Sequence, residues 1–390
     1  MKISQNKYRI DYLLSLYNMR KEELLLAIND EKLKKTITWD DIYCDEIELN
    51  YLKRIDKVFK MGLVYYLDPE VPVKNSNASI FFRKDNFNTE LNIGAKKKVR
   101  EFEDLKVSIS AISKMSDLNL VRKLETYTIN DNPKDVAFSL RDKILSKVNR
   151  SLGKKNFLKD FINNLGEYNI FVFEFVETFN KKEKANIDGF YLHPNTIVLR
   201  RLQKSLSREI FTLAHELGHY LLDKEEIEKI DVVESINSNL NDIEIWCNNF
   251  SYNFLLGKEN DRLLSNIEKF DVSNDYGYKL IDEISNNTFL SRIAIYTNLL
   301  LNNQLSKSDY FKIKESIEEE WRNRLKQEER EKEEKKALGI EIRGSAPKPI
   351  IADITTSVLN IALNSGVINE YEYCKTLKIK PENIDKYFYL

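Results

Sequence analysis

The chain reads IFTLAHELGHYLL from Ile210 to Leu222, and this stretch decides the fold around it. It contains the pattern H-E-x-x-H at residues 215–219. We expect a helix over residues 207–222, with Ser207 as its N-cap. Residues four apart lie on one face of a helix, so His215 and His219 can point at the same metal ion.

The residue between the histidines predicts what such a metal would do. Glu216 is turned by about 100° from His215, so it flanks the metal and can act as a base on zinc-bound water, whose pKa falls to about 7. The base takes a proton as the water attacks a peptide carbonyl. The alternative to a metal site is that the two histidines lie at helical spacing on a face that packs into the core. The chain has three histidines in all, so their pairing here, with Glu216 and the small Gly218, favours Zn²⁺ chemistry.

A catalytic zinc site needs a third protein ligand, and Glu244 is the best candidate. It opens a helix 25 residues after His219, and Asn248 lies one turn later, where it can hydrogen-bond a ligating histidine. The alternative role for Glu244 is a solvated carboxylate favoured by the helix dipole. Asp242 and Glu234 are rival ligands.

For other side chains near this motif, the sequence allows two alternative roles. Cys247 follows Glu244 by three residues, so it is either a thiolate ligand or a small buried apolar residue. His193 either stabilises an oxyanion or is an exposed turn histidine. Tyr191 and His193 are candidate substrate-binding residues, and the sequence does not decide between Tyr191, Tyr220 and Tyr252.

The segments that flank this helix in the sequence predict a small sheet beside it. Residues 169–176 are aromatic and β-branched, which favours a strand. Residues 189–192 and 196–199, separated by His-Pro-Asn, predict a hairpin. Helices are expected over residues 157–165 and 243–256. The fold class predicted is α+β, mainly helical.

The rest of the chain is predicted to be helical. Short helices over residues 8–64 suggest a helix-turn-helix bundle. The charged residues 316–336 predict either a solvated helix or a disordered tether. We expect four segments: a helix-turn-helix-like domain at 1–68, a helical linker at 69–150, a metallopeptidase domain at 151–305, and a charged helix with C-terminal helices at 306–390.

Composition excludes several classes of protein. Charged residues make up 32% but leave a net charge of −1, so a strongly basic nucleic-acid binder is excluded. Three dispersed cysteines argue against a disulfide framework and fit a reducing cytosol. Because there is no apolar signal core and no long apolar run, we expect a soluble cytoplasmic protein that does not enter membranes.

Two segments of the chain resemble the ImmA/IrrE family of zinc-dependent metallopeptidases. One is residues 210–222, and the other is residues 244–256, which are similar to the family's Glu-x-x-Ala-Asn-x-Phe-Ala-x-x-Leu-Leu stretch. Cys247 and Ser251 replace the two alanines, and Gly257-Lys258 stands where the family has Met-Pro. The resemblance implies a zincin-like domain, Glu244 as third ligand, and an N-terminal repressor-type helix-turn-helix.

The resemblance also implies a role in regulation, because members are similar to regulators that relieve repression in mobile elements or stress responses. We therefore expect a zinc endopeptidase that cuts a specific protein, a transcriptional regulator. The rivals are a DNA-binding regulator or antitoxin-like protein with a mainly structural metal, and an interaction protein with a vestigial site. Residues 1–64 carry twelve Lys/Arg and eleven Asp/Glu, so they bind DNA only through a local patch and otherwise dock a protein partner or a dimer mate.

Overall fold

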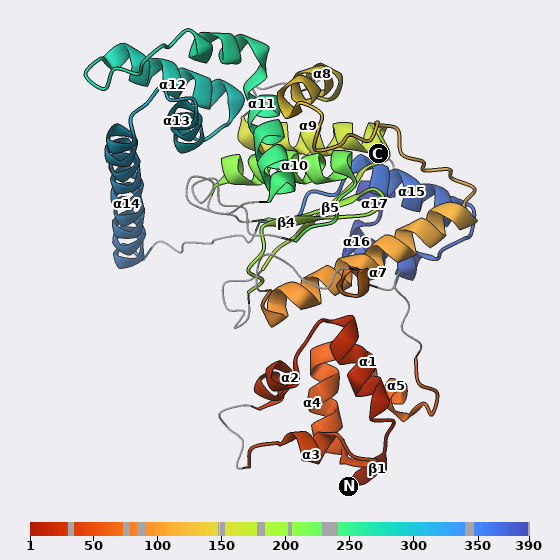
Figure 1. Ribbon diagram of the computed structural model, residues 1–390. Helices are drawn as coiled ribbons and strands as arrows, with labels where there is room; N and C mark the ends of the chain where they lie inside the picture. Colours follow the sequence, from red (N-terminus) through yellow and green to blue (C-terminus); the bar gives the residue numbers. More distant parts are fainter. Residues whose placement is uncertain are drawn as a thin grey trace. The chain divides into compact units, whose positions relative to one another are not determined.

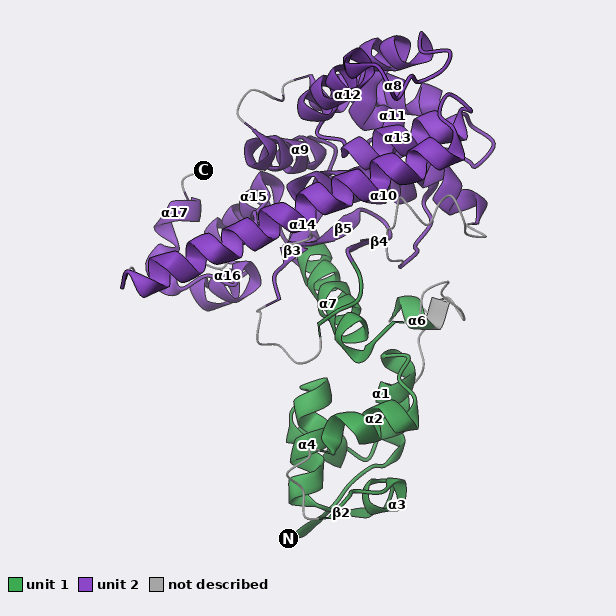
Figure 2. Cartoon of the chain, turned by 90° about the vertical axis from the view of Figure 1, so that its left-hand side faces the viewer, with its two compact units in different colours: residues 1–111, 180–187 green, residues 112–179, 188–390 purple. Residues whose placement is uncertain are grey.

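The computed structural model forms two compact units, which are described separately (Figure 2). It describes residues 1–29, 35–72, 79–83, 91–146, 148, 153–177, 184–201, 205–227, 241–339 and 347–388. Unit 1 comprises residues 1–111 and 180–187, and unit 2 comprises residues 112–179 and 188–390. The four segments predicted from the sequence have other boundaries than these units, and they stay a prediction.

Unit 1 is a helical bundle with a two-stranded sheet. Its strands β1 and β2 pair antiparallel, and its core is built from the apolar faces of the short helices, as the pattern over residues 8–64 predicted. The elements are β1 (Lys2–Ser4), α1 (Tyr8–Leu16), α2 (Lys21–Ile28), α3 (Trp39–Ile42), β2 (Glu46–Glu48), α4 (Leu49–Phe59), α5 (Leu63–Leu67), α6 (Ile80–Arg83) and most of α7 (Ile93–Met115).

Unit 2 is built on a three-stranded mixed sheet. Its strands are β3 (Phe171–Phe175), β4 (Gly189–Leu192) and β5 (Thr196–Arg200). The order is β3-β5-β4, with β3 parallel to β5 and β4 antiparallel to it. The predicted strand and the predicted hairpin are therefore both confirmed. The order leaves β4 at one edge of the sheet.

Helices cover one face of this sheet (Figure 1). The helix α9 (Lys154–Glu167) packs on β3, and α10 (Leu206–Leu222) packs on β4 and β5. Behind them, α11 (Asp242–Ser265) packs against both α10 and α8 (Pro133–Leu145). The helix with the H-E-x-x-H pattern is thus enclosed on both sides, and the mainly helical α+β class is confirmed.

The start of α10 corrects one prediction. Ser205, not Ser207, is the N-cap: its backbone is extended and its hydroxyl accepts a hydrogen bond from the backbone N–H of Arg208. Ser207 is buried within the first turn. Both serines have the chemistry of a cap, and the choice depends on which residue leaves helical backbone angles.

The helix α11 bends where the predicted helix over residues 243–256 ends. Gly257 has φ 80° and ψ 160°, a conformation that side chains disfavour. Arg141 of α8 donates to the carbonyls of Phe254 and Leu255 there. A Cβ on Gly257 would lie 2.6 Å from Arg141 Nε, so glycine is needed at the kink.

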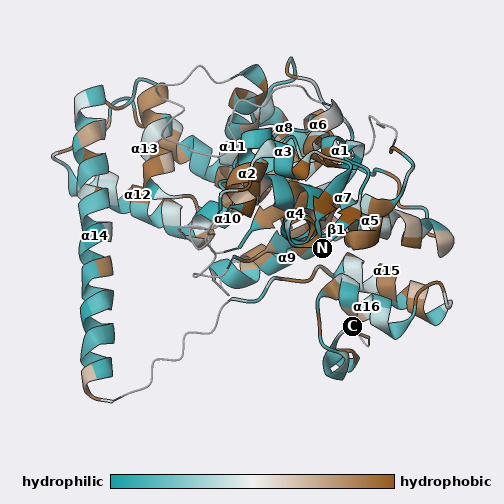
Figure 3. Ribbon diagram, turned by 90° about the horizontal axis from the view of Figure 1, so that it is seen from below, coloured by the Kyte–Doolittle hydropathy of each residue, from teal (hydrophilic) through white to brown (hydrophobic). Residues whose placement is uncertain are grey.

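The remaining helices follow this kink. The long helix α14 includes residues 316–336, so these residues are helical rather than a disordered tether. This helix is mostly hydrophilic (Figure 3), and it buries only Tyr310 and Ile313. In the described part of the chain, no helix is long and apolar enough to cross a membrane. The elements are α12 (Asp275–Thr288), α13 (Arg292–Leu301), α14 (Lys307–Ala337), α15 (Asp353–Asn364), α16 (Glu370–Leu377), a 3₁₀ turn (Pro381–Asn383) and α17 (Asp385–Phe388).

Candidate metal centre

Three side chains from α10 and α11 converge in the interior of unit 2. The Nε2 atoms of His215 and His219 lie 3.1 Å apart, and each lies 3.1 Å from an oxygen of Glu244. The three residues are between 1% and 3% exposed. Two imidazole nitrogens and a carboxylate oxygen are the donor set of a catalytic zinc site. These residues fit a metal ion.

Close packing of the two helices brings Glu244 to the histidines. A Cβ built on Gly218 would lie 3.1 Å from the Sγ atom of Cys247 and 3.2 Å from its Cα. Such separations are tighter than most Cβ contacts, so a larger residue would push the helices apart. Glycine inside the motif therefore lets α11 approach α10 closely enough for ligands from both helices to meet.

A further contact orients one histidine. Asn248 lies one turn after Glu244 on α11, and its Oδ1 atom is 3.1 Å from Nδ1 of His215. Because the amide oxygen accepts, Nδ1 carries the proton and Nε2 presents a lone pair to the cluster. This is the contact that the spacing of Glu244 and Asn248 predicted.

The three clustered side chains shift one another's pKa values. Burial alone would raise the pKa of Glu244, but the neighbouring imidazoles more than offset it and the pKa is lowered. Burial lowers the pKa of His215. The pKa of His219 is raised, because Cys247 and Glu244 outweigh burial.

Glu216 lies beside the cluster and next to the edge strand β4. It is 3% exposed and does not belong to the group of candidate ligands among the described residues. A Cβ on Gly189 would lie 3.1 Å from Glu216 Oε1 and 2.7 Å from Cγ2 of Thr212. The backbone of β4 therefore passes directly over this carboxylate.

The rival ligand Asp242 does not join the cluster. Asp242 is exposed at the first position of α11, and Glu234 lies outside the described residues. Cys247 is fully buried as a free thiol next to His219. Burial raises the pKa of this thiol to about 11, and Cys247 does not belong to the group of candidate ligands among the described residues.

The two candidate substrate-binding residues meet at a shared carboxylate. The hydroxyl of Tyr191 donates to Asp223 Oδ1 at 2.8 Å, and Nδ1 of His193 lies 2.8 Å from the same oxygen. Tyr191 is buried, with its ring edge-on to Tyr220, whereas His193 is exposed in the hairpin turn. Tyr252 is buried in the core. A role in substrate binding for Tyr191 and His193 stays a prediction.

Sequence reasoning missed Gly189 and Asp223, and it noted Gly218 only for its small size. Gly189 and Gly218 allow close approaches, and Asp223 ties the hairpin turn to the end of α10. A glycine inside a strand pattern is itself a signal of close backbone approach, so Gly189 could have been found. Asp223 carries no comparable signal, because its partners become neighbours only on folding.

Residues 175–264 match the model of a peptidase family described as the IrrE N-terminal-like domain. This segment of the chain belongs to the ImmA/IrrE family. The ImmA/IrrE domain includes β4, β5, α10 and nearly all of α11, and so contains every residue of the candidate metal centre. It supports a metallopeptidase-like function. No curated protein and no solved structure matched the chain.

Proposed function

We propose that this protein is a cytoplasmic zinc-dependent endopeptidase that cleaves a specific protein, a transcriptional regulator. The observation that carries the proposal is the buried group of His215, His219 and Glu244 with Glu216 beside it. A metal held only for stability is usually enclosed by four protein ligands. Three candidate ligands with an adjacent carboxylate that is not one of them favour hydrolysis.

Each residue of the site has a distinct role in this mechanism. A zinc ion held there supplies Lewis acidity, which polarises the scissile carbonyl and makes water a nucleophile at neutral pH. Glu216 takes the proton from the attacking water and delivers it to the leaving amine. Asn248 keeps Nδ1 of His215 protonated, so that Nε2 is available as a ligand.

The edge strand β4 would align the substrate. Arg200 N–H donates to the carbonyl of Asp188, so residues 188 and 200 form a hydrogen-bonded pair of the antiparallel ladder. By alternation, the backbone groups of Gly189 and Tyr191 are directed away from β5, toward the free edge. A peptide added there by strand pairing would pass over Glu216.

The test is co-expression of the protein with the products of its neighbouring genes. We expect a new fragment of one product with the wild type and none with Glu216→Gln, because the variant lacks the base but retains the ligands. The exposed Glu259→Gln is the matched control and should cleave normally. A fragment formed equally by Glu216→Gln would instead favour a regulator whose metal is structural.

A further inference from the structure

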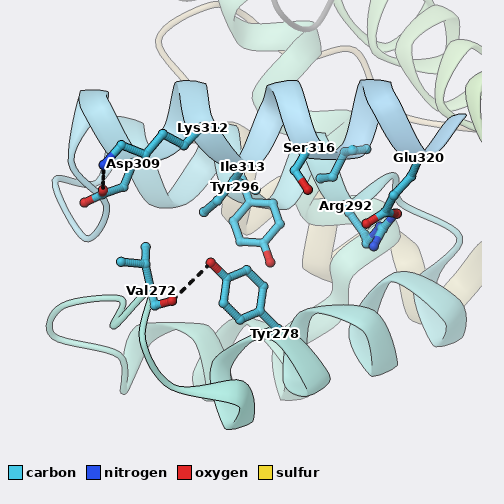
Figure 4. Close-up of a pocket in the computed structure, with 10 residues that line it drawn as sticks. Val272, Tyr278, Arg292, Tyr296, Asp309, Lys312, Ile313, Ser316 and Glu320 are labelled. Carbon is cyan, nitrogen blue, oxygen red and sulfur yellow. Dashed lines mark hydrogen bonds and ion pairs between the residues drawn. The ribbon is translucent and has the colours of Figure 1, made fainter. Parts of the chain in front are cut away.

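A pocket of about 380 Å³ lies among α12, α13 and α14 (Figure 4). These helices follow the kink in α11 and lie outside the segment that matches the ImmA/IrrE family. The pocket therefore belongs to a part of the chain for which the peptidase chemistry gives no role. Its volume is within the range of about 300–1,000 Å³ that small-molecule sites have.

Three hydroxyl groups point into this space. Figure 4 shows the phenols of Tyr278 and Tyr296 directed toward each other and the hydroxyl of Ser316 directed toward the same region. Tyr278 donates a long bond of 3.4 Å to the carbonyl of Val272. Burial raises the pKa of both phenols, so they stay protonated and able to donate as well as accept.

The charged groups at the two ends of the pocket neutralise each other. Arg292 is paired with Glu320 at 2.6 Å and with Asp282 at 3.5 Å. At the other end Lys312 lies 3.4 Å from Asp309. An anion would meet the carboxylates of these pairs and a cation would meet their partners, so neither gains from entering.

The walls between these ends are apolar and aromatic. The side chains of Ile313 and Ile317 on α14 line the pocket together with the two tyrosine rings. The ring centroids of Tyr278 and Tyr296 are 6.4 Å apart, and the planes are inclined by 57°. Tilted rings of this kind present faces and edges to a planar guest.

We propose that this pocket binds an uncharged small molecule with a planar ring that carries an amide, carbonyl or hydroxyl group. The ring packs against the tyrosines and Ile313, and the polar group bonds to the hydroxyls of Tyr278, Tyr296 and Ser316. Because α12 and α13 supply one wall and α14 the other, the ligand holds α14 against its neighbours. The site is independent of the metal centre.

Three probes with the same ring test the chemistry of the ligand: benzamide, benzoate and benzylammonium. Ligand-observed NMR on the full-length protein should show benzamide binding, with charged analogues at least tenfold weaker. Equal binding of benzoate or benzylammonium, or an absence of benzamide binding up to its solubility limit, would overturn the proposal.

Two variants test the location. Ser316→Trp fills the pocket from an exposed position, and the double variant Tyr278→Phe/Tyr296→Phe removes two hydroxyls while keeping both rings. Each should weaken benzamide binding at least tenfold, with an unchanged circular dichroism spectrum. Tyr276→Phe, an exposed tyrosine of the same helix as Tyr278, is the matched control. Wild-type affinity in both pocket variants would place benzamide elsewhere and refute the site.

Discussion

At the residue scale, the metal centre depends on a small number of buried polar atoms. Nδ1 of His219 has no hydrogen-bond partner, although its ring is 2% exposed. A buried polar atom without a partner costs about 1–3 kcal/mol. A site that tolerates this cost is consistent with a functional constraint on His219 rather than with a contribution to stability.

The first prediction concerns the metal content of the purified protein. We expect about one zinc per chain, as three protein ligands would give, and its loss in His215→Ala and His219→Ala. Asn248→Ala should keep zinc with an affinity about 10–100-fold lower, because it orients a ligand without being one. Elemental analysis after dialysis measures both, and full occupancy in the double histidine variant would refute the site.

The second prediction concerns Gly189, where β4 passes over Glu216. Gly189→Ala should reduce cleavage and leave zinc content unchanged, because the added methyl displaces the carboxylate or the strand rather than a ligand. Overpacking of this kind costs about 1–3 kcal/mol in stability. Denaturant unfolding and a cleavage assay measure the two effects.

A double variant separates the two contacts of that methyl group. Adding Thr212→Ser removes the Cγ2 atom, which is the closest contact at 2.7 Å, and keeps the hydroxyl that bonds to the carbonyl of Arg208. The double variant should regain stability but not cleavage. Full recovery of cleavage would show that Glu216 was not displaced.

At the scale of the elements, the position of β4 in the sheet determines the third prediction. A proline at Tyr191 removes an N–H directed toward the free edge, so it should impair cleavage more than zinc binding. A proline at Val198 removes an N–H of the central strand and should destabilise the whole sheet.

The controls for this prediction account for the tyrosine side chain. Tyr191→Phe loses the bond to Asp223 but keeps the backbone N–H, and Tyr191→Ala also loses the ring. If Tyr191→Pro and Tyr191→Ala cleave at the same rate, strand addition at this edge is rejected. Turnover and zinc content should be measured for all four variants.

The fourth prediction concerns Glu174 on β3, which accepts a hydrogen bond of 2.6 Å from the backbone N–H of Ile350. Burial raises the pKa of Glu174 to about 7 from 4.5, against the opposing effects of this bond and of Arg201. The folded state therefore holds the proton more tightly than the unfolded chain. Stability should fall as pH rises from about 4.5 to about 7 and then level off.

Glu174→Gln should remove this contribution, because glutamine still accepts from Ile350 and has no proton to lose. Above pH 7 the variant should be more stable than the wild type by up to about 3 kcal/mol. Denaturant unfolding between pH 4.5 and 8.5 measures the difference, with the exposed Glu329→Gln as control. A difference that does not change with pH would contradict the assignment.

At the scale of the whole molecule, the role of unit 1 remains a proposal, and its charges favour protein docking over DNA. A local patch for DNA would consist of Lys34, Lys35, Lys53 and Arg54, of which Lys34 lies outside the described residues. Arg54 donates to the carbonyl of Ile28 at 3.0 Å, and Lys35 lies 3.5 Å from Asp41. Two of the four cations are thus engaged within unit 1.

The fifth prediction follows from this charge distribution. The full-length protein should show no tight, sequence-selective binding to its own promoter, because the acidic Asp40, Asp41, Asp45 and Glu46 would repel phosphates. Titration at two salt concentrations, with a scrambled duplex as control, measures it. Tight binding that weakens steeply with salt and prefers the promoter would establish a DNA-reading role instead.

Local periodicity explains how much of the fold was predictable. The helical repeat alone places His215 and His219 on one face of α10, and the alternation around residues 193–195 alone predicts the pairing of β4 with β5. Both features depend only on neighbours along the chain. The start of α10 was predicted at Ser207 rather than Ser205, because two serines could each cap it.

Tertiary structure alone decided the rest. The spacing of Glu244 predicted a ligand but left Asp242 as a rival, and the choice between these two required α11 to approach α10 at Gly218. Likewise, a hairpin does not specify which of its strands a third strand joins. Here β3 joins β5, which leaves β4 at the edge and Gly189 over Glu216. Sequence determined the residues of the site, and packing between distant segments determined which of them meet.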